Sequence, residues 1–145
     1  MAARTATATW EGSVQQGRGQ MSLGSGAFEG AYSFKSRFEE GENGTSPEEL
    51  VAAAHAGCFT MALALHLGEA GNEPQSLETR ARVSMRNLPD TGPTITKITL
   101  VTSGRVPGID QAAFEQAAET AKKTCIVSRA LGGVDEIALE ATLES

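Results

Sequence analysis

Cysteine and aromatic residues are scarce in this sequence, and these shortages exclude several classes of protein. The 145 residues include only two cysteines, too few for the disulfide scaffold of a small secreted domain. One Trp and one Tyr do not supply a platform on which nucleic-acid bases stack. No cluster of Lys or Arg is present, and the net charge of −6 argues against a general nucleic-acid or anionic-membrane binder.

Long apolar runs are also scarce, and the one that exists is better explained as a core helix than as a membrane span. The first six residues carry no stretch of signal-peptide length. The apolar stretch 50–67 is interrupted by His55 and His66. With 40% apolar and 21% charged residues, we expect a single soluble domain over 1–145, in the cytoplasm. In that compartment a cysteine pair is more often redox-active or metal-binding than structural.

Alternating apolar and polar residues predict an α+β fold with the order βββ-α-ββ-α-β. The expected strands are 5–10, 21–23, 32–38, 79–86, 94–103 and 137–143. Arg37 falls on the polar face of the third. The glycine-rich tract 17–26 is interpreted as hairpin turns, because no lysine follows it in phosphate-loop spacing.

A long helix is predicted to begin at Pro47. Ser46 is the expected N-cap, Pro47 takes the first helical position, and Glu49 is expected to complete a capping box. The helix should end near Gly68 or Gly71. Because it is apolar nearly all round, we expect it to be central to the fold.

The two cysteines lie on different helical segments. Cys58 is within the long helix. A second helix, capped by Asp110, should run to about Lys123, which places Cys125 at its end or at the start of a further turn. One interpretation is two unrelated core cysteines, since free cysteine is among the most buried residue types.

Zinc binding is the second interpretation. His55 and Cys58 are three residues apart on one helix face, and Cys125 is the remaining candidate ligand. His66 lies ~16 Å from His55 along the helix axis, too far to share one ion. Both histidines are more simply interpreted as residues with hydrogen-bond partners.

A thiol redox pair is the third interpretation. The thiolate is the nucleophile, and burial disfavours it unless a cation is close. Arg37 is the candidate because a guanidinium stays charged when buried. Its counter-charge would be Glu48, since Glu49 is assigned to the cap. Alternatively, Glu48 only complements the helix dipole and Arg37 is a solvated strand residue.

Several segments resemble the osmotically inducible protein C (OsmC) family, relatives of the organic hydroperoxide resistance proteins. The resemblance rests on Arg37–Glu39, Ser46–Leu50 and, most specifically, Ala53–Leu63, while Trp10–Gly12 favours the OsmC branch. Shorter matches occur at 95–98, 106–109 and 125–128. The implied fold has antiparallel sheets packed around a long central buried helix, in an intertwined homodimer.

The resemblance implies a thiol-dependent peroxidase that reduces organic hydroperoxides in oxidative-stress defence. Cys58 matches the peroxidatic cysteine, Cys125 the resolving cysteine, Arg37 the activating arginine and Glu48 its partner. No metal or cofactor is expected, but an external dithiol, in this family a lipoylated protein, must reduce the resulting disulfide. Ile126 replaces a proline that is usual in the family, and this loss is expected to loosen the geometry around Cys125.

Phe59 and Met61 are the expected substrate-pocket residues, and their apolar side chains suit an organic hydroperoxide. An alternative function is a non-enzymatic module that binds a small apolar ligand on the same fold. Glu48 and Cys58 are ~15 Å apart along one helix, so an arginine that engages both favours two antiparallel helices from different chains. A kink near Gly57 is the competing explanation.

Overall fold

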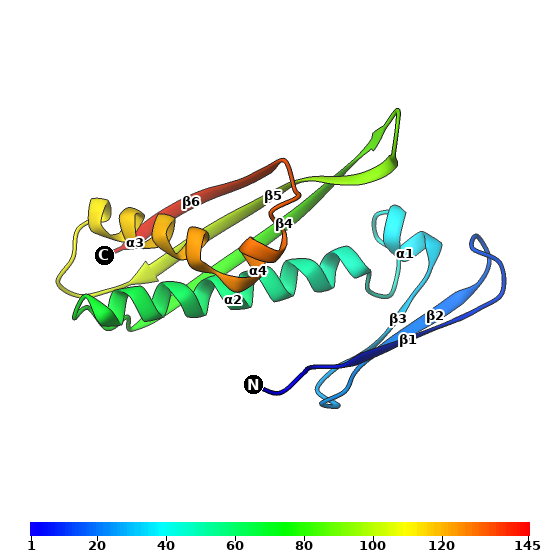
Figure 1. Ribbon diagram of the computed structural model, residues 1–145, viewed down its shortest axis with the longest axis horizontal. Helices are drawn as coiled ribbons and strands as arrows, with labels where there is room; N and C mark the ends of the chain where they lie inside the picture. Colours follow the sequence, from blue (N-terminus) through cyan, green and yellow to red (C-terminus); the bar gives the residue numbers. More distant parts are fainter. The chain divides into compact units, whose positions relative to one another are not determined.

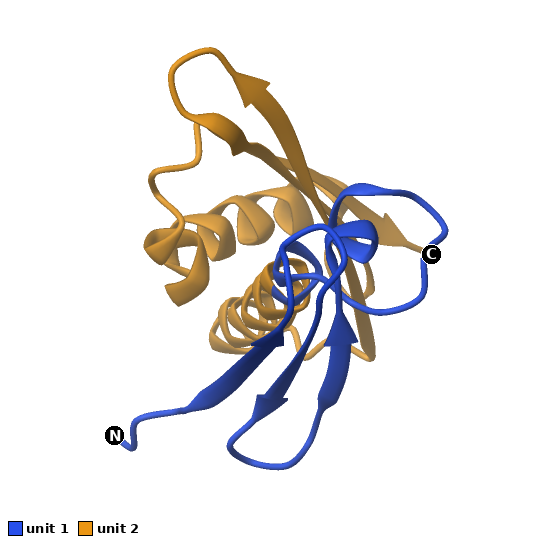
Figure 2. Ribbon diagram, turned by 90° about the vertical axis from the view of Figure 1, so that its right-hand side faces the viewer, with its two compact units in different colours: residues 1–50 blue, residues 51–145 orange.

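The computed structural model describes all 145 residues and consists of two compact units, 1–50 and 51–145 (Figure 2). The strands are β1 (Ala6–Glu11), β2 (Arg18–Leu23), β3 (Glu29–Tyr32), β4 (Ser76–Leu88), β5 (Gly92–Arg105) and β6 (Glu136–Glu144). The helices are α1 (Phe34–Phe38), α2 (Pro47–Glu69), α3 (Gln111–Thr124) and α4 (Ile126–Ala130). The predicted α+β class is confirmed, with α1 and α4 as additional short helices. That residues 1–145 fold as one domain stays a prediction.

The first unit is built on a three-stranded antiparallel sheet in the order β1-β2-β3. Trp10 and Tyr32 pack with their ring centroids 5.4 Å apart. Gly19 of β2 pairs with both of these residues, and a Cβ atom there would lie 2.5 Å from the Tyr32 ring. Glycine is therefore needed at this point for the aromatic pair to close over the strand.

Arg37 lies on helix α1, so its predicted placement on a strand is wrong. Ser33 ends the extended segment by capping α1: its hydroxyl accepts from the Ser36 backbone N–H, and the Ser36 hydroxyl accepts from the Ser33 N–H. Phe34 and Phe38, four residues apart, then pack with centroids at 4.9 Å. The same apolar spacing fits alternation in a strand, and the reciprocal serine cap favours the helix.

The start of α2 is largely as predicted. Pro47 is its first residue, and the Ser46 hydroxyl accepts from the Glu49 backbone N–H at 3.1 Å. The second half of the predicted capping box is wrong, because the Glu49 carboxylate instead accepts from the Thr45 hydroxyl at 2.6 Å. The helix continues unbroken through Gly57.

The second unit has helices on one face of a three-stranded sheet (Figure 1). β4 and β5 form an antiparallel hairpin, whereas β6 lies parallel to β5, so this sheet is mixed rather than antiparallel. A parallel neighbour requires a long crossover, which α3 and α4 supply. The core between helices and sheet contains residues of α2, α3 and β5, including Phe59, Leu63, Leu67, Leu100, Phe114, Ala118 and Ala121.

Only one face of α2 is buried within the chain. His55, Phe59, Leu63 and Leu67 recur every four residues and are at most 2% exposed. On the other side, Met61 is 79% exposed. By length and composition alone α2 is apolar enough to cross a membrane. Its buried stripe packs in the core of the second unit, so it is a core helix, as expected from the sequence.

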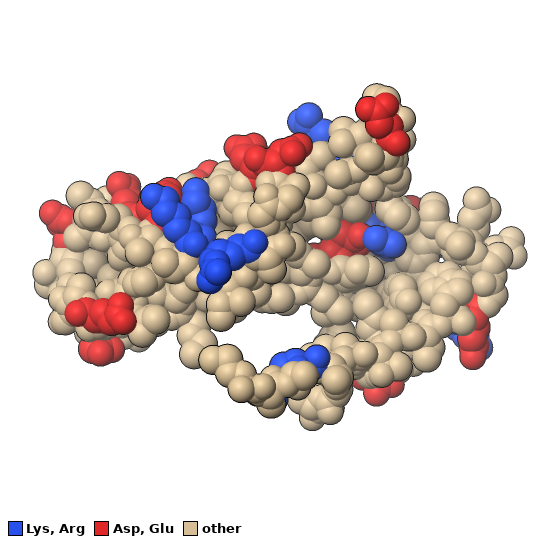
Figure 3. Space-filling view, in the orientation of Figure 1, with Lys and Arg blue, Asp and Glu red and all other residues tan.

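Charged side chains are dispersed over the face of the molecule that Figure 3 shows. On the face drawn in Figure 3, basic and acidic groups lie in small clusters separated by wide neutral areas. This face therefore offers no continuous basic surface of the kind that tracks a nucleic-acid backbone.

Candidate active site

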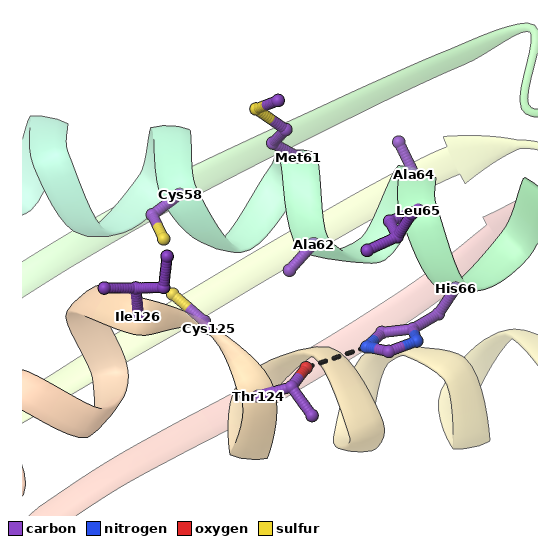
Figure 4. A pocket seen from close by; sticks show the side chains of 9 residues that line it. All are labelled: Cys58, Met61, Ala62, Ala64, Leu65, His66, Thr124, Cys125 and Ile126. Atoms are coloured by element: carbon purple, nitrogen blue, oxygen red, sulfur yellow. Dashed lines mark hydrogen bonds between the residues drawn. The ribbon is translucent and has the colours of Figure 1, made fainter. Parts of the chain in front are cut away.

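The two cysteines lie beside each other in the second unit. Cys58 projects from α2, and Cys125 forms the joint at which α3 ends and α4 begins. Its φ of −54° and ψ of 124° interrupt the helical path between those two helices. Both thiols are free, and Figure 4 shows their sulfur atoms directed toward one another. Residues that are 67 positions apart in the sequence are thus brought together.

A cavity of about 530 Å³ opens beside the cysteine pair (Figure 4). Its lining is mainly apolar and consists of Cys58, Met61, Ala62, Ala64, Leu65, His66, Thr124, Cys125 and Ile126. Met61 thus lines the cavity, and its role as a substrate-pocket residue stays a prediction. Phe59 does not line this cavity, because its side chain is fully buried in the core. Neighbours along a helix point about 100° apart, which separates Phe59 from the face of Cys58.

Burial is the largest influence on Cys58 and raises the pKa of its thiol. The backbone N–H of Val127 opposes this, the neighbouring Cys125 reinforces it, and the N–H of Ile126 opposes it weakly. No cation from residues 51–145 contributes. Within the second unit, the environment of Cys58 therefore favours the thiol over the reactive thiolate.

Cys125 has a different environment. Burial alone would raise its pKa, but hydrogen-bond donors outweigh burial and lower the pKa of this thiol. They are chiefly the Ser128 backbone N–H, at 3.5 Å from the sulfur, followed by the Cys58 thiol and the Ser128 hydroxyl. The two adjacent thiols therefore differ in pKa: the surroundings raise the pKa of Cys58 and lower the pKa of Cys125.

Arg37 and Glu48 form an ion pair within the first unit. The guanidinium Nε and Nη2 both contact Oε1 of Glu48, at 2.8 and 2.7 Å. The second carboxylate oxygen is buried and has no hydrogen-bond partner. The Arg37 side chain is 42% exposed and lies 5.3 Å from the Phe38 ring centroid. Because a guanidinium has five N–H donors, this arginine retains capacity to bind another anion.

Both histidines have hydroxyl partners. Nε2 of His55 lies 2.6 Å from the Ser128 hydroxyl, and Nε2 of His66 lies 2.7 Å from the Thr124 hydroxyl. No group of three or more His, Cys, Asp or Glu residues is arranged to hold a metal ion. The structure therefore gives the zinc interpretation no support.

Ser128 is the residue of this site that sequence reasoning missed. Its backbone N–H bonds the Cys125 sulfur in the manner of an N-cap, and its hydroxyl meets His55. The available signal was its position three residues after Cys125, the usual spacing between a capping side chain and the N–H that it accepts.

Similarity to known proteins identifies the family. A family profile described as OsmC-like protein matches residues 39–140. The chain belongs to the OsmC-like family. It is 48% identical over 139 residues to the protein named Peroxiredoxin OsmC from Escherichia coli (strain K12), covering 95% of this chain and 94% of that one.

Solved structures agree with this assignment. The organic hydroperoxide resistance protein OhrB of Bacillus subtilis superposes with a TM-score of 0.73 and 26% identity, over 97% of this chain and 98% of that one. An OsmC-like protein from Mycoplasma pneumoniae gives a TM-score of 0.77 over 99% of both chains. At 16% identity, the latter supports the OsmC-like fold alone.

Ile126 occupies the first position of α4, where proline is usual in the OsmC-like family. The start of α4 is formed with isoleucine, and Cys125 caps it. Unlike proline, isoleucine has a backbone N–H, and this N–H favours the Cys58 thiolate. The ψ of 124° at Cys125 is also compatible with a following proline.

We predict that Ile126→Pro keeps the fold but makes Cys58 less acidic. Proline at a compatible position should stabilise the folded state by about 0.4–1 kcal/mol. Loss of the N–H donor should raise the pKa of Cys58 and so slow its alkylation at neutral pH. Alkylation against pH in a Cys125→Ser background measures this, with Ile126→Val as the control that keeps the N–H. Equal midpoints for the proline and valine variants would rule out the donor.

Proposed function

We propose that this chain is a peroxiredoxin-type, thiol-dependent peroxidase that reduces organic hydroperoxides, and hydrogen peroxide more weakly, in oxidative-stress defence. The observation that carries the proposal is the pair of free cysteines directed at each other beside an apolar cavity. The 48% identity to Peroxiredoxin OsmC supports the reaction, and the similarity to OhrB supports the substrate class. The apolar lining suits the organic group of a hydroperoxide.

The first step oxidises Cys58. Its thiolate attacks one peroxide oxygen, so that a sulfur–oxygen bond forms as the oxygen–oxygen bond breaks. The alkoxide leaves and takes up a proton to become the alcohol. Cys58 is left as a sulfenic acid, oxidised by two electrons, while the peroxide is reduced.

The second step protects that sulfur. The Cys125 thiolate attacks the Cys58 sulfur, a disulfide forms, and the oxygen leaves as water after protonation. Donors that lower the pKa of Cys125 favour this attack. Disulfide formation stops oxidation before the irreversible sulfinic acid. An external dithiol, which we propose is carried by a lipoylated protein, then regenerates both thiols by exchange, without a resident cofactor or metal.

Arg37 is proposed to activate Cys58, with Glu48 holding the guanidinium in place. Burial raises the pKa of Cys58, so the first step requires a cation to oppose it. The Arg37–Glu48 pair uses one carboxylate oxygen and leaves guanidinium N–H donors for a thiolate or a peroxide oxygen.

We propose that the active form is a cytoplasmic homodimer. The face of α2 that carries Met61 and Leu65 is apolar and exposed in one chain, at 79% and 58%. Association that covers this face would remove it from water. An antiparallel arrangement of two α2 helices would also place Glu48 of one chain near Cys58 of its partner.

Cysteine variants test the assigned roles. Cys58→Ser should abolish consumption of cumene hydroperoxide, because the attacking atom is lost. Cys125→Ser should reduce about one equivalent and then over-oxidise. In the unmodified protein, stoichiometric peroxide should convert both thiols into one intrachain disulfide. Thiols that remain unreacted would support the apolar-ligand module instead, and identical behaviour of the two variants would contradict the division of roles.

Arg37→Met tests thiolate activation. We expect the fold to persist and the pKa of Cys58 to rise, because burial then acts unopposed. Alkylation rate against pH reports the midpoint directly, and Arg37→Lys should restore only part of the activity because lysine lacks the planar fork. A midpoint that does not move in the methionine variant would remove Arg37 from the first step.

A heterodimer tests which chain supplies Glu48. Glu48 and Cys58 are ten positions apart on the unbroken helix α2, or ~15 Å along its axis. Co-expression of Glu48→Ala with Cys58→Ser should give one intact site and about half of the activity if the site is shared across the two-fold axis. If Glu48 serves its own chain, the purified heterodimer should be no more active than the Glu48→Ala homodimer.

A further inference from the structure

A buried histidine lies next to the cysteine pair and has no part in the chemistry described above. His55 is fully buried, and it precedes Cys58 by three residues on α2. Its Nε2 lies 2.6 Å from the hydroxyl of Ser128, which is 6% exposed and follows Cys125 by three residues. One hydrogen bond therefore joins the two segments that carry the reacting sulfurs.

The location of the histidine proton decides what this bond does. Burial lowers the pKa of His55, so the ring is neutral and carries one N–H. Its Nδ1 is buried and has no partner. A proton on Nδ1 would be a buried donor without an acceptor, which is the rarer defect in folded proteins. The proton therefore belongs on Nε2, which donates to Ser128.

This assignment fixes the direction of the Ser128 hydroxyl. Because Ser128 Oγ accepts from His55, its own proton is available to a second acceptor. The Cys125 sulfur accepts a hydrogen bond from the Ser128 backbone N–H at 3.5 Å, and the Ser128 hydroxyl is among the groups that lower the pKa of Cys125. Ser128 thus bonds the sulfur that must attack as a thiolate through its backbone N–H, and it has a hydroxyl proton left to donate.

We propose that His55 and Ser128 form a hydrogen-bond relay, Nε2–H to Oγ and O–H to Sγ, that holds Cys125 ready as the resolving thiolate. The inference rests on the proposed function and adds two residues to it. Ser128 touches a reacting atom, whereas His55 acts through Ser128 and is a positioning residue. The relay acts on Cys125, which attacks in the second step, so we expect it to change the rate of disulfide formation.

Titration of Cys125 in the Cys58→Ser protein tests the relay without any peroxide. The other thiol that faces Cys125 is absent from this protein, so iodoacetamide reports one sulfur. Ser128→Ala should raise the alkylation midpoint and leave about tenfold less thiolate at neutral pH, and His55→Leu should act in the same direction. Ser128→Thr and His55→Gln keep a hydroxyl and an N–H donor, and they should restore most of the effect.

A matched control separates the relay from general loss of packing. Thr102→Val removes another buried hydroxyl, which contacts Thr79 at 2.9 Å in the sheet. It should lower the melting temperature without moving the Cys125 midpoint. If Ser128→Ala and Ser128→Thr titrate alike, or if His55→Leu changes stability but not the midpoint, the relay is overturned.

Single-turnover kinetics with both cysteines present then link the relay to catalysis. Disulfide formation after reaction with cumene hydroperoxide should slow about threefold in Ser128→Ala. The factor is below ten because a thiolate of higher pKa is intrinsically more nucleophilic. Dimedone labelling of the sulfenic acid should increase accordingly. A shifted midpoint with an unchanged rate of disulfide formation would contradict the link to catalysis. The titration uses no peroxide, so it tests the relay even if the protein is not a peroxidase.

Discussion

The packing of one face of α2 against α3 and the sheet determines where the chemistry of this chain takes place. The buried stripe His55, Phe59, Leu63 and Leu67 fixes the rotation of the helix about its axis. Cys58, next to Phe59, then lies at the border between the core and the exposed apolar face. The same packing brings the end of α3 alongside, so that Cys125 meets Cys58 at the cavity. The core side chains of α2 thus set the rotation of the helix, and that rotation places Cys58 beside Cys125.

The two thiols show how local hydrogen bonding distinguishes chemically identical groups. Both are partly desolvated, which by itself favours the protonated form. Both thiols receive N–H groups that the start of α4 leaves unpaired, but these donors outweigh burial only at Cys125, which caps that helix. The cap position thus lowers the pKa of Cys125 without a charged neighbour, whereas the pKa of Cys58 stays raised by burial.

Sequence patterns predicted the elements with regular periodicity and failed where the deciding contact was local or distant. The Ser46-Pro47 start of α2 followed from a short capping signal, and strands β4 and β5 followed from alternation. Arg37 was misplaced because Phe34 and Phe38 satisfy both strand alternation and helical spacing. The parallel pairing of β6 and the contact between His55 and Ser128 depend on residues far apart in sequence, which periodicity in one segment does not reveal.

The replacement of proline by isoleucine at position 126 illustrates a compromise between rigidity and acidity at one backbone position. Proline would restrict the unfolded chain and preset the first turn of α4, but it would remove an N–H that favours the Cys58 thiolate. Isoleucine keeps that donor and adds an apolar side chain, 73% exposed, to the cavity lining. The start of α4 still forms without a proline, because the Cys125 side chain caps it by accepting the Ser128 backbone N–H. The start of α4 in this chain is therefore stabilised by hydrogen bonds at Cys125, and the same bonds lower the pKa of the Cys125 thiol.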